Sequence, residues 1–268
     1  GGIFNIVFDY IFIGQLHMGI TGAALATFLG LLLSFIMGVV YFVTHPNFLH
    51  FTFHGLSIKE AFRSMVNGTS EFVNQLAIAI TTVVFNRSAL LFAGEDGVAA
   101  VSIIMYLQFL CIGIYFGFSM GLSTPLGYAY GDRNFSVCRV LEKYAYRFFA
   151  IAPIILYGGT YLLTPIGVRF FASPGSTVFD MAVCGLRLYG LGFLFSGINI
   201  FAAIRMMTYG KGYISGMITF LRSFALLLLF LTVLPRFLEL NGIWLAVPTA
   251  EILTLIVALW TLRKKTVV

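Results

Sequence analysis

Long apolar runs separate the polar residues of this chain, and the length of each run predicts its structure. A helix rises 1.5 Å per residue, so about 20 mostly apolar residues are needed to cross a hydrocarbon core roughly 30 Å thick. Seven runs meet that requirement: Gly22–Thr44, Gly68–Ala93, Val98–Tyr128, Tyr144–Pro165, Leu186–Thr208, Gly212–Leu234 and Gly242–Leu262. They predict an all-α integral membrane protein built as a polytopic helix bundle.

The chain opens on a shorter apolar run, GGIFNIVFDYIFIG, which covers residues 1–14. As a helix this run would reach only about 21 Å, which is too short to cross a membrane. We expect it to be the end of a helix whose first half precedes residue 1. The prediction is therefore seven full transmembrane helices plus a truncated one, in a chain that is part of a longer protein.

A weak internal similarity predicts two lobes. The strings GITGAALATF (19–28) and GIWLAVPTAE (242–251) share a glycine, an isoleucine and an alanine at equivalent positions. Parallel repeats of this kind are common in transporters. We predict that residues 1–45 end an N-lobe with its partial fifth and full sixth spans. Residues 46–67 would form a cytoplasmic linker, and residues 68–268 a C-lobe of six transmembrane helices.

Composition and charge placement support the membrane assignment and give it an orientation. The chain is 60% hydrophobic and 10% charged, whereas soluble domains are roughly 45–50% apolar and about 25% charged. Lysine and arginine concentrate in cytoplasmic loops. Alternate loops hold eleven such residues against two: Lys59, Arg63, Arg133, Arg139, Lys143, Arg147, Arg205, Lys211, Arg263, Lys264 and Lys265 against Arg169 and Arg236. We therefore predict a cytoplasmic C-terminus, a location in the cytoplasmic (inner) membrane, and no nucleic-acid partner.

Asp9 is a carboxylate within the opening apolar run, and Asn5 lies one helical turn before it on the same face. A charge within a membrane costs about 2.5–3.5 kcal/mol on insertion scales and is functional by default. A carboxylate and an amide carbonyl together offer oxygen ligands to Na⁺, or a site that binds a proton. The alternative is that Asp9 marks a helix end that reaches water.

Two further polar groups are candidates for the lining of a cavity. Glu71, Asn74 and Gln75 share one helical face about a turn into their span, and they are either a polar site or a wetted helix start. Arg222 and Glu251 both fall near mid-depth on consecutive spans. They are expected to form a buried ion pair; otherwise Glu251 faces the cavity. The three cysteines show no metal-ligand spacing, so no metal and no cofactor is predicted.

The string FNIVFDYIFIGQLHMGITGAALAT resembles the junction of the fifth and sixth spans in the multidrug and toxic compound extrusion (MATE) family. There N-x-x-x-D is followed by an apolar run and then by G-x-x-G-A-A-x-A-T. Four later strings also resemble that family, in its order: GEDGVAAVSI, YFGFSMGLSTPLGYAYGDRN, GINIFAAIRMMTYGKGYISGMITFLRS and GIWLAVPTAEILT. The resemblance covers nearly the whole chain, and its strength lies in order and spacing rather than in any single motif.

The resemblance implies a twelve-span antiporter with two six-helix lobes around a central cavity, a monomer when full length. Such a protein exports amphipathic compounds, often cations, in exchange for inward H⁺ or Na⁺, and its partners are these small molecules and membrane lipid. Asn5 and Asp9 would belong to a cation or proton site of the N-lobe. Many family members carry an acidic residue deeper on the span of Glu71, where this chain has Ile78, Ala79 and Ile80. That departure prevents a direct transfer of the family's C-lobe site.

Two other functions are weighed against export. Distant relatives with the same lobe design flip lipid-linked oligosaccharides, which calls for a strongly cationic cavity, and only Arg87, Arg187 and Arg222 are candidates for one. A membrane enzyme would need a motif such as DDxxD or HExxH, or a cluster of histidine and aspartate, and the sequence has none. We therefore predict a transporter and not an enzyme.

Overall fold

The computed structural model describes residues 1–44 and 57–263, which are almost entirely helical and contain no strand. The chain divides into two compact units, Gly1–Ile58 and Lys59–Val268. We refer to them as the N-terminal unit and the C-terminal unit. By length and composition, six helices in the described residues are able to cross a membrane. The all-α membrane helix bundle predicted from the sequence is confirmed.

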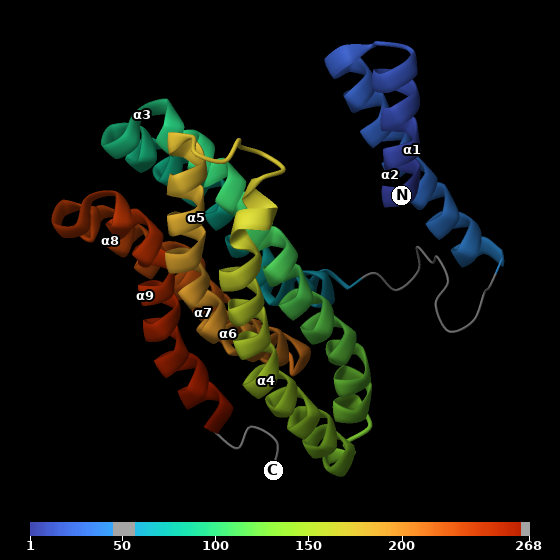
Figure 1. Ribbon diagram of the computed structural model, residues 1–268. Helices are drawn as coiled ribbons and strands as arrows, with labels where there is room; N and C mark the ends of the chain where they lie inside the picture. The colour runs from blue at the N-terminus through green and yellow to red at the C-terminus, as the bar shows by residue number, and fades with distance from the viewer. Residues whose placement is uncertain (45–56, 264–268) are drawn as a thin grey trace. The chain divides into compact units, whose positions relative to one another are not determined.

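The N-terminal unit is a helical hairpin. It consists of α1 (Gly2–Asp9), the π-helical turn η1 (Tyr10–Gln15) and α2 (Gly19–Thr44), and α1 lies beside α2 (Figure 1). Gly22, Ala26 and Gly30 are the buried residues of α2, and their spacing of four places them on one face. A side chain at Gly30 would come 3.1 Å from the Gly1 carbonyl oxygen. The small residues therefore allow the close approach that holds Asn5 and Asp9 near α2.

The C-terminal unit is a bundle of helices whose long members run beside one another in Figure 1. The chain order is α3 (Ile58–Gly131), α4 (Phe135–Val168), α5 (Thr177–Tyr189), η2 (Gly190–Gly192), α6 (Phe193–Thr208), α7 (Gly212–Phe220), η3 (Leu221–Ala225), α8 (Leu226–Val233) and α9 (Pro235–Arg263). The 3₁₀ turn η2 joins α5 to α6, and the π-helical turn η3 joins α7 to α8. Each of these pairs therefore forms one continuous span.

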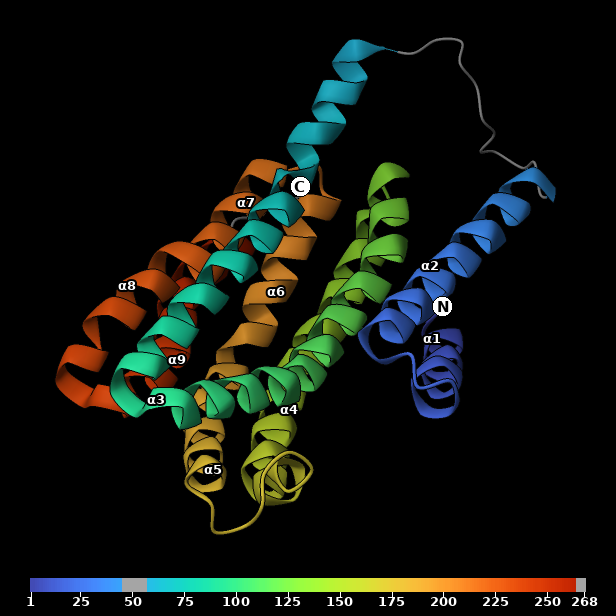
Figure 2. The same ribbon diagram turned by 90° about the horizontal axis from the view of Figure 1, so that it is seen from above.

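Helix α3 is too long to be one span and is broken at Gly94. Its 74 residues would reach about 110 Å if straight. Gly94 has φ 62° and ψ −151°, a conformation open to glycine because it has no Cβ. Figure 2 shows the two arms of α3 meeting at an angle. The predicted spans Gly68–Ala93 and Val98–Tyr128 lie on these arms, which reconciles six apolar helices with seven predicted spans.

Capping residues start two helices earlier than hydropathy alone predicts. Asn134 caps α4 by accepting a hydrogen bond from the Val137 amide at 3.3 Å. Ser176 caps α5 in the same way, accepting from the Phe179 amide at 3.2 Å. These helices start about nine residues before the predicted Tyr144 and Leu186. The reason is that hydropathy marks the immersed part of a helix, whereas a cap fixes where its hydrogen bonding begins.

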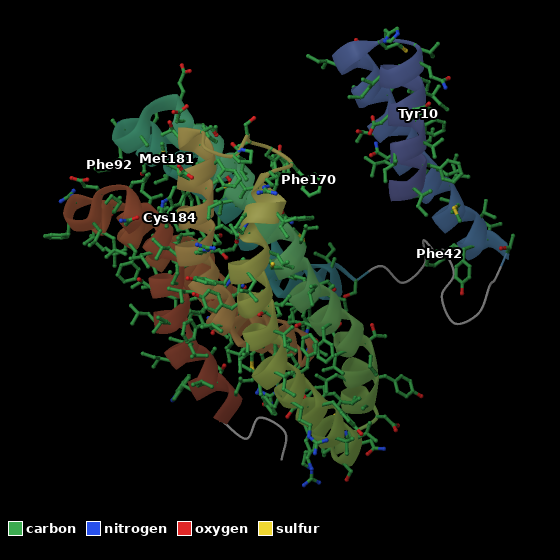
Figure 3. The ribbon with its side chains drawn as sticks, in the orientation of Figure 1. Tyr10, Phe42, Phe92, Phe170, Met181 and Cys184 are labelled. Atoms are coloured by element: carbon green, nitrogen blue, oxygen red, sulfur yellow. The ribbon has the colours of Figure 1, made fainter. Side chains whose placement is uncertain are left out.

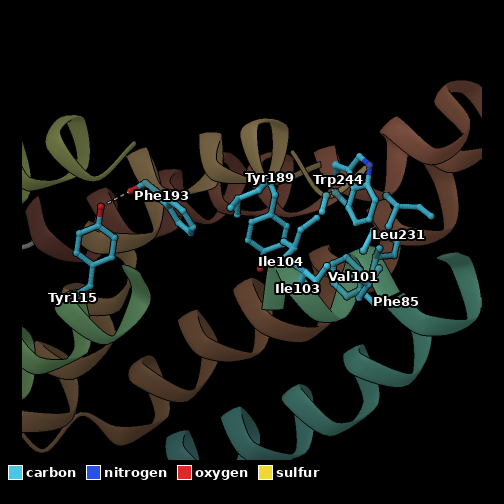
Figure 4. Close-up of a cluster of buried hydrophobic side chains, with 14 of the residues drawn as sticks. Phe85, Val101, Ile103, Ile104, Tyr115, Tyr189, Phe193, Leu231 and Trp244 are labelled. Carbon is cyan, nitrogen blue, oxygen red and sulfur yellow. Dashed lines mark hydrogen bonds between the residues drawn. The ribbon is translucent and has the colours of Figure 1, made fainter. Parts of the chain in front are cut away.

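The core of the C-terminal unit lies where α3, α5, α6 and α9 meet. Its largest buried side chains include Trp244, Tyr115 and Phe193, and Figure 4 shows them with their neighbours. A side chain at Gly185 would come 2.9 Å from the Trp244 ring, so the glycine is what admits the tryptophan. The Tyr115 hydroxyl donates to the Phe193 carbonyl oxygen at 2.8 Å, which satisfies both groups within the apolar core.

The outward-facing side chains are largely apolar. Phe92 and Phe170 project from the C-terminal unit, and Tyr10 and Phe42 from the N-terminal unit (Figure 3). All four are exposed in the structure, and Phe170 is 84% exposed. In water such surfaces would favour aggregation, whereas lipid solvates them. Together with the long apolar helices, they identify a multi-pass membrane protein.

Candidate functional site

Asn5 and Asp9 lie on the face of α1 that packs against α2. The Asn5 amide nitrogen, Nδ2, donates to Thr27 Oγ1 on α2 at 3.4 Å. The Thr27 hydroxyl in turn donates to the Ala23 carbonyl oxygen at 3.0 Å. Asp9 is half-buried and ends α1 directly before the π-helical turn η1. Among the described residues, no hydrogen bond or ion pair engages its carboxylate.

These three side chains offer oxygen atoms from two helices: the Asp9 carboxylate, the Asn5 carbonyl and the Thr27 hydroxyl. Hard cations such as Na⁺ prefer oxygen ligands of this kind, and the carboxylate alone also binds a proton. The sequence reasoning missed Thr27. The signal was present, because Thr27 is the threonine that ends the string GITGAALAT on the neighbouring helix.

The polar face proposed on the span beginning at Gly68 lies on the first arm of α3. The side chains of Glu71 and Asn74 fall outside the described part of the structure, and Gln75 is exposed. The prediction of a cavity-facing polar group at these positions therefore stays a prediction.

Arg222 and Glu251 are brought together in the C-terminal unit. Arg222 lies in the π-helical turn η3 and Glu251 in α9, and Arg222 Nε is 3.7 Å from Glu251 Oε1. Their side chains are 13% and 8% exposed. Asn199 on α6 completes the cluster, because its Nδ2 donates to Glu251 Oε2 at 2.7 Å and to the Glu251 carbonyl oxygen at 2.9 Å. The sequence reasoning missed Asn199, although Asn199 stands within one of the strings that carry the family resemblance.

Several polar atoms at this cluster are buried without a hydrogen bond. They are Arg222 Nη1, Asn199 Oδ1 and, one helical turn before Asn199, Ser196 Oγ. Buried polar groups in proteins are nearly always paired with protein or water, so unpaired ones point to water or to a second arrangement of the cluster. We use the name buried cluster for Asn199, Arg222 and Glu251.

A second ion pair lies at the C-terminal end of α6, and it was not predicted from the sequence. Arg205 Nε is 2.5 Å from Glu142 Oε1 on α4, and the Tyr209 hydroxyl donates to the same oxygen at 2.6 Å. Arg205 also stacks over the Tyr209 ring at 5.1 Å. Tyr209 follows the end of α6, and burial, reinforced by its hydrogen bond to Glu142, raises the pKa of its phenol.

Arg205 was counted among the loop charges, and this was wrong. It lies in the last turn of α6 and is 4% exposed. Hydropathy could not place it, because an arginine at the end of an apolar run has the same sequence pattern whether it faces water or a partner. Without it, the loop count is eleven minus one, or ten against two, and the predicted orientation is unchanged.

The other arginines of the spans have different surroundings. Arg187 Nε donates to the Tyr161 carbonyl oxygen at 3.3 Å, and its guanidinium lies 4.6 Å from the centre of the Tyr161 ring. Arg87 is exposed on the first arm of α3 and lines a groove of about 600 Å³ together with Asn86 and Glu95. Within the described residues Arg87 has no ion pair.

The chain shares its fold with several solved transporters. One is an outward-facing multidrug resistance MATE family transporter of the MOP superfamily, at 23% identity and a TM-score of 0.85. Another is a MOP superfamily transporter from Pyrococcus furiosus, whose binding pocket of reverse polarity suggests a different function. It matches at 23% identity and a TM-score of 0.85. A third is a MATE protein in complex with MaL6, at 22% identity and a TM-score of 0.86. Each match covers 96% of this chain and 59% of the other.

This chain thus spans about three fifths of the length of the transporters it matches. No protein-family model matches the sequence, and no curated protein does. The structural match nevertheless extends over nearly all of the chain, from the hairpin that carries Asp9 to α9. It confirms, at the level of fold, the resemblance noted in the sequence: the chain has the fold of MATE family transporters of the MOP superfamily.

Proposed function

We propose that this chain belongs to a cation-coupled antiporter that exports amphipathic drugs or metabolites across the cytoplasmic membrane. Inward movement of H⁺ or Na⁺ drives export, and Asp9 with Asn5 and Thr27 binds the coupling ion. The C-terminus lies in the cytoplasm, in keeping with the excess of lysine and arginine in the loops on that side.

The observation that carries this proposal is the unpaired carboxylate of Asp9. It lies in an apolar helix, half-buried, with no protein cation beside it in the described residues. An ionised carboxylate in that setting is costly unless a cation or a proton neutralises it. Asn5 and Thr27 add oxygen atoms on the same side of α1. A mobile cation from solution would therefore be stabilised there, and its arrival would change the charge of the hairpin.

The arrangement of the arginines supports export over lipid-linked oligosaccharide flipping. A pyrophosphate group would need several free cationic side chains. Of the three candidates, Arg222 is paired with Glu251 and Arg187 is engaged by Tyr161. Arg87 is left, and it shares its groove with Glu95.

The test is dye efflux by the full-length protein in proteoliposomes, with either an inward Na⁺ gradient or an inward H⁺ gradient. Asp9→Asn removes the titratable charge and keeps the size of the side chain, so ion-driven efflux should be abolished while membrane insertion is retained. Asp180→Asn is the matched control, because Asp180 is exposed in the first turn of α5. Wild-type efflux by Asp9→Asn would show that Asp9 is only a wetted helix end. The gradient that drives transport identifies the ion.

A further inference from the structure

The buried cluster lies in the apolar interior of the C-terminal unit, on helices other than those that carry Asp9. Glu251 is on α9, Arg222 in η3 and Asn199 on α6. An ion pair at membrane depth can be purely structural, because pairing is how such charges are tolerated. The geometry of this pair differs in three respects from what a purely structural pair requires.

The first respect is that the ion pair is open. At 3.7 Å, Arg222 Nε and Glu251 Oε1 are beyond hydrogen-bonding distance, and Arg222 Nη1 has no acceptor. The Glu142–Arg205 pair of the same unit shows the closed alternative, at 2.5 Å with a tyrosine hydroxyl on the same oxygen. The Arg222–Glu251 contact is therefore weak enough to be broken without the loss of a full hydrogen bond.

The second respect is that the Asn199 amide is able to form a hydrogen bond with Glu251 whether Glu251 is ionised or protonated. Its Nδ2 now donates to Oε2, which suits an ionised carboxylate, because a carboxylate only accepts. Its Oδ1 is buried and has no donor. A half-turn of the amide exchanges these two atoms, so Oδ1 would then accept from the hydroxyl of a protonated Glu251, at the cost of the hydrogen bond from Nδ2 to the Glu251 carbonyl oxygen. No other residue of the cluster combines a donor and an acceptor in this way.

The third respect is the position of Arg222 in the π-helical turn Leu221–Ala225. A π-helical turn contains an extra residue relative to an α-helix, and such turns occur frequently at functional sites. The side chains of Arg222 and Glu251 are 13% and 8% exposed, so both charges are largely buried.

The titratable neighbours of Glu251 are few. Arg222 faces it from η3, and Tyr189 of α5 and Tyr115 of α3 lie close enough to interact electrostatically with its carboxylate. Both phenols already donate elsewhere, Tyr189 to Gln108 and Tyr115 to the Phe193 carbonyl oxygen. Of the other elements packed on α9, α7, α8 and η2 carry no charged side chain. Arg187 of α5 and Arg205 of α6 are engaged by Tyr161 and Glu142, and Asp180 of α5 is exposed in the first turn of its helix. A change in the charge of Glu251 therefore alters mainly its electrostatic interaction with Arg222.

We propose that Glu251 is a proton-binding site separate from the Asp9 site. A proton from water adds to the carboxylate and forms an O–H bond, while Arg222 keeps its charge. The net charge of the cluster rises from zero to plus one, and the guanidinium loses its partner. Release returns the proton to water and re-forms the pair. The proposal concerns proton binding alone and does not depend on which substrate the protein moves or on whether Asp9 couples transport.

The experiment is infrared spectroscopy of the purified full-length protein during a pH titration. A protonated carboxylic acid has a carbonyl stretch that a carboxylate lacks. The wild-type protein should gain such a band as pH falls, and Glu251→Gln should lose the part that belongs to this site. Asp9→Asn should keep that part, which separates the two carboxyl groups. If the spectra of wild type and Glu251→Gln differ by no acid band at any pH at which the protein stays folded, the proposal is wrong and the cluster is a fixed ion pair.

Two variants sharpen the test. Arg222→Gln removes the cation that favours the carboxylate, so the Glu251 proton should bind with an affinity raised by about tenfold or more. Asn199→Ala removes the donor to Oε2 and should act in the same direction. If either single variant fails to fold, the other is titrated alone. An acid band whose midpoint is unchanged in every folded variant would contradict the role given to the cluster.

Discussion

Two pairs of an asparagine with a carboxylate, one in each unit, use the same groups in opposite ways. Asn5 and Asp9 lie one turn apart on a single helix, and the Asn5 amide donates away from Asp9 to Thr27. Asn199 and Glu251 lie on different helices, and the Asn199 amide donates twice to Glu251. Arg222 then adds a positive charge to the second pair alone.

The difference indicates what each site is able to bind. A carboxylate without a protein cation has room for an ion from solution, and Asp9 is of this kind. A carboxylate with a built-in cation gains little from Na⁺, because the guanidinium already supplies the charge, but a proton can still displace that interaction. Both sites adjoin π-helical turns, η1 after Asp9 and η3 around Arg222. Such turns occur frequently at functional sites.

The largest effect is expected from breaking the pair in the C-terminal unit. Arg222→Met leaves Glu251 buried without its cation, which should lower the free energy of unfolding by about 3–5 kcal/mol at neutral pH. The double variant Arg222→Met with Glu251→Gln removes both charges and should be more stable than the single one. Unfolding by denaturing detergent in mixed micelles measures both. Because protonation neutralises the unpaired Glu251, the loss of unfolding free energy in Arg222→Met should become smaller as the pH falls.

Additive losses of unfolding free energy in that double-mutant cycle would contradict the difference between the two units, since they would mean that Arg222 and Glu251 do not interact. Asp9→Asn is the counterpart in the other unit. It removes a carboxylate that has no cation partner among the described residues, so it should change stability far less than Arg222→Met. A destabilisation of equal size would show that Asp9 has a cation partner in the full-length protein.

An intermediate effect is expected from Asn199→Ala. The substitution removes two hydrogen bonds to Glu251, one of them to the charged carboxylate, and should cost about 2 kcal/mol. Thr254→Val is the matched control, because Thr254 is equally buried but its hydroxyl bonds only within its own helix, to the Ala250 carbonyl oxygen. The same unfolding measurement applies. Equal losses in the two variants would mean that Asn199 contributes only packing.

The smallest effect on stability is expected from Thr27→Val, which removes the acceptor of a long hydrogen bond from Asn5 and should cost under about 1 kcal/mol. Its relative effect on efflux should be larger, because the Asn5 amide, and with it the Asn5 carbonyl oxygen, is then no longer held in one orientation. The measurement is the concentration of Na⁺, or the pH, at which efflux is half-maximal. Thr44→Val is the control, since the Thr44 hydroxyl donates to carbonyl groups of its own helix and lies at the far end of α2 from Thr27. An unchanged midpoint would remove Thr27 from the site.

The sequence predicted the membrane helix bundle correctly and marked two carboxylates as candidates, and the reason is physical. A membrane demands about 20 apolar residues for each crossing, so the spans show in the sequence as long runs. A carboxylate inside such a run is conspicuous, which is how Asp9 and Glu251 were found. Arg222 was paired with Glu251 because two helices joined by a short loop are usually neighbours.

The polar partners that come from distant helices were not predicted. Thr27 and Asn199 stand within strings that carry the family resemblance, but for these two residues and for Glu142 the local pattern does not tell which distant side chain each one meets. They matter only because packing brings α6 to α9, α2 to α1 and α4 to α6. The break at Glu239, which has φ 49°, was not foreseen either, because a positive φ at a residue other than glycine is imposed by the surrounding structure.

By itself, then, the sequence determined which segments enter the membrane and which charges accompany them, because the transfer of residues from water to lipid depends on composition and length alone. Only the tertiary structure decided how those charges are neutralised. Within the part of the chain that the structure describes, Asp9 is left without a protein cation because its neighbours on α2 are small or neutral, whereas Glu251 meets both Asn199 and Arg222 across helix contacts. Electrostatic interactions act through space over a few ångströms, and distances along the chain do not fix them.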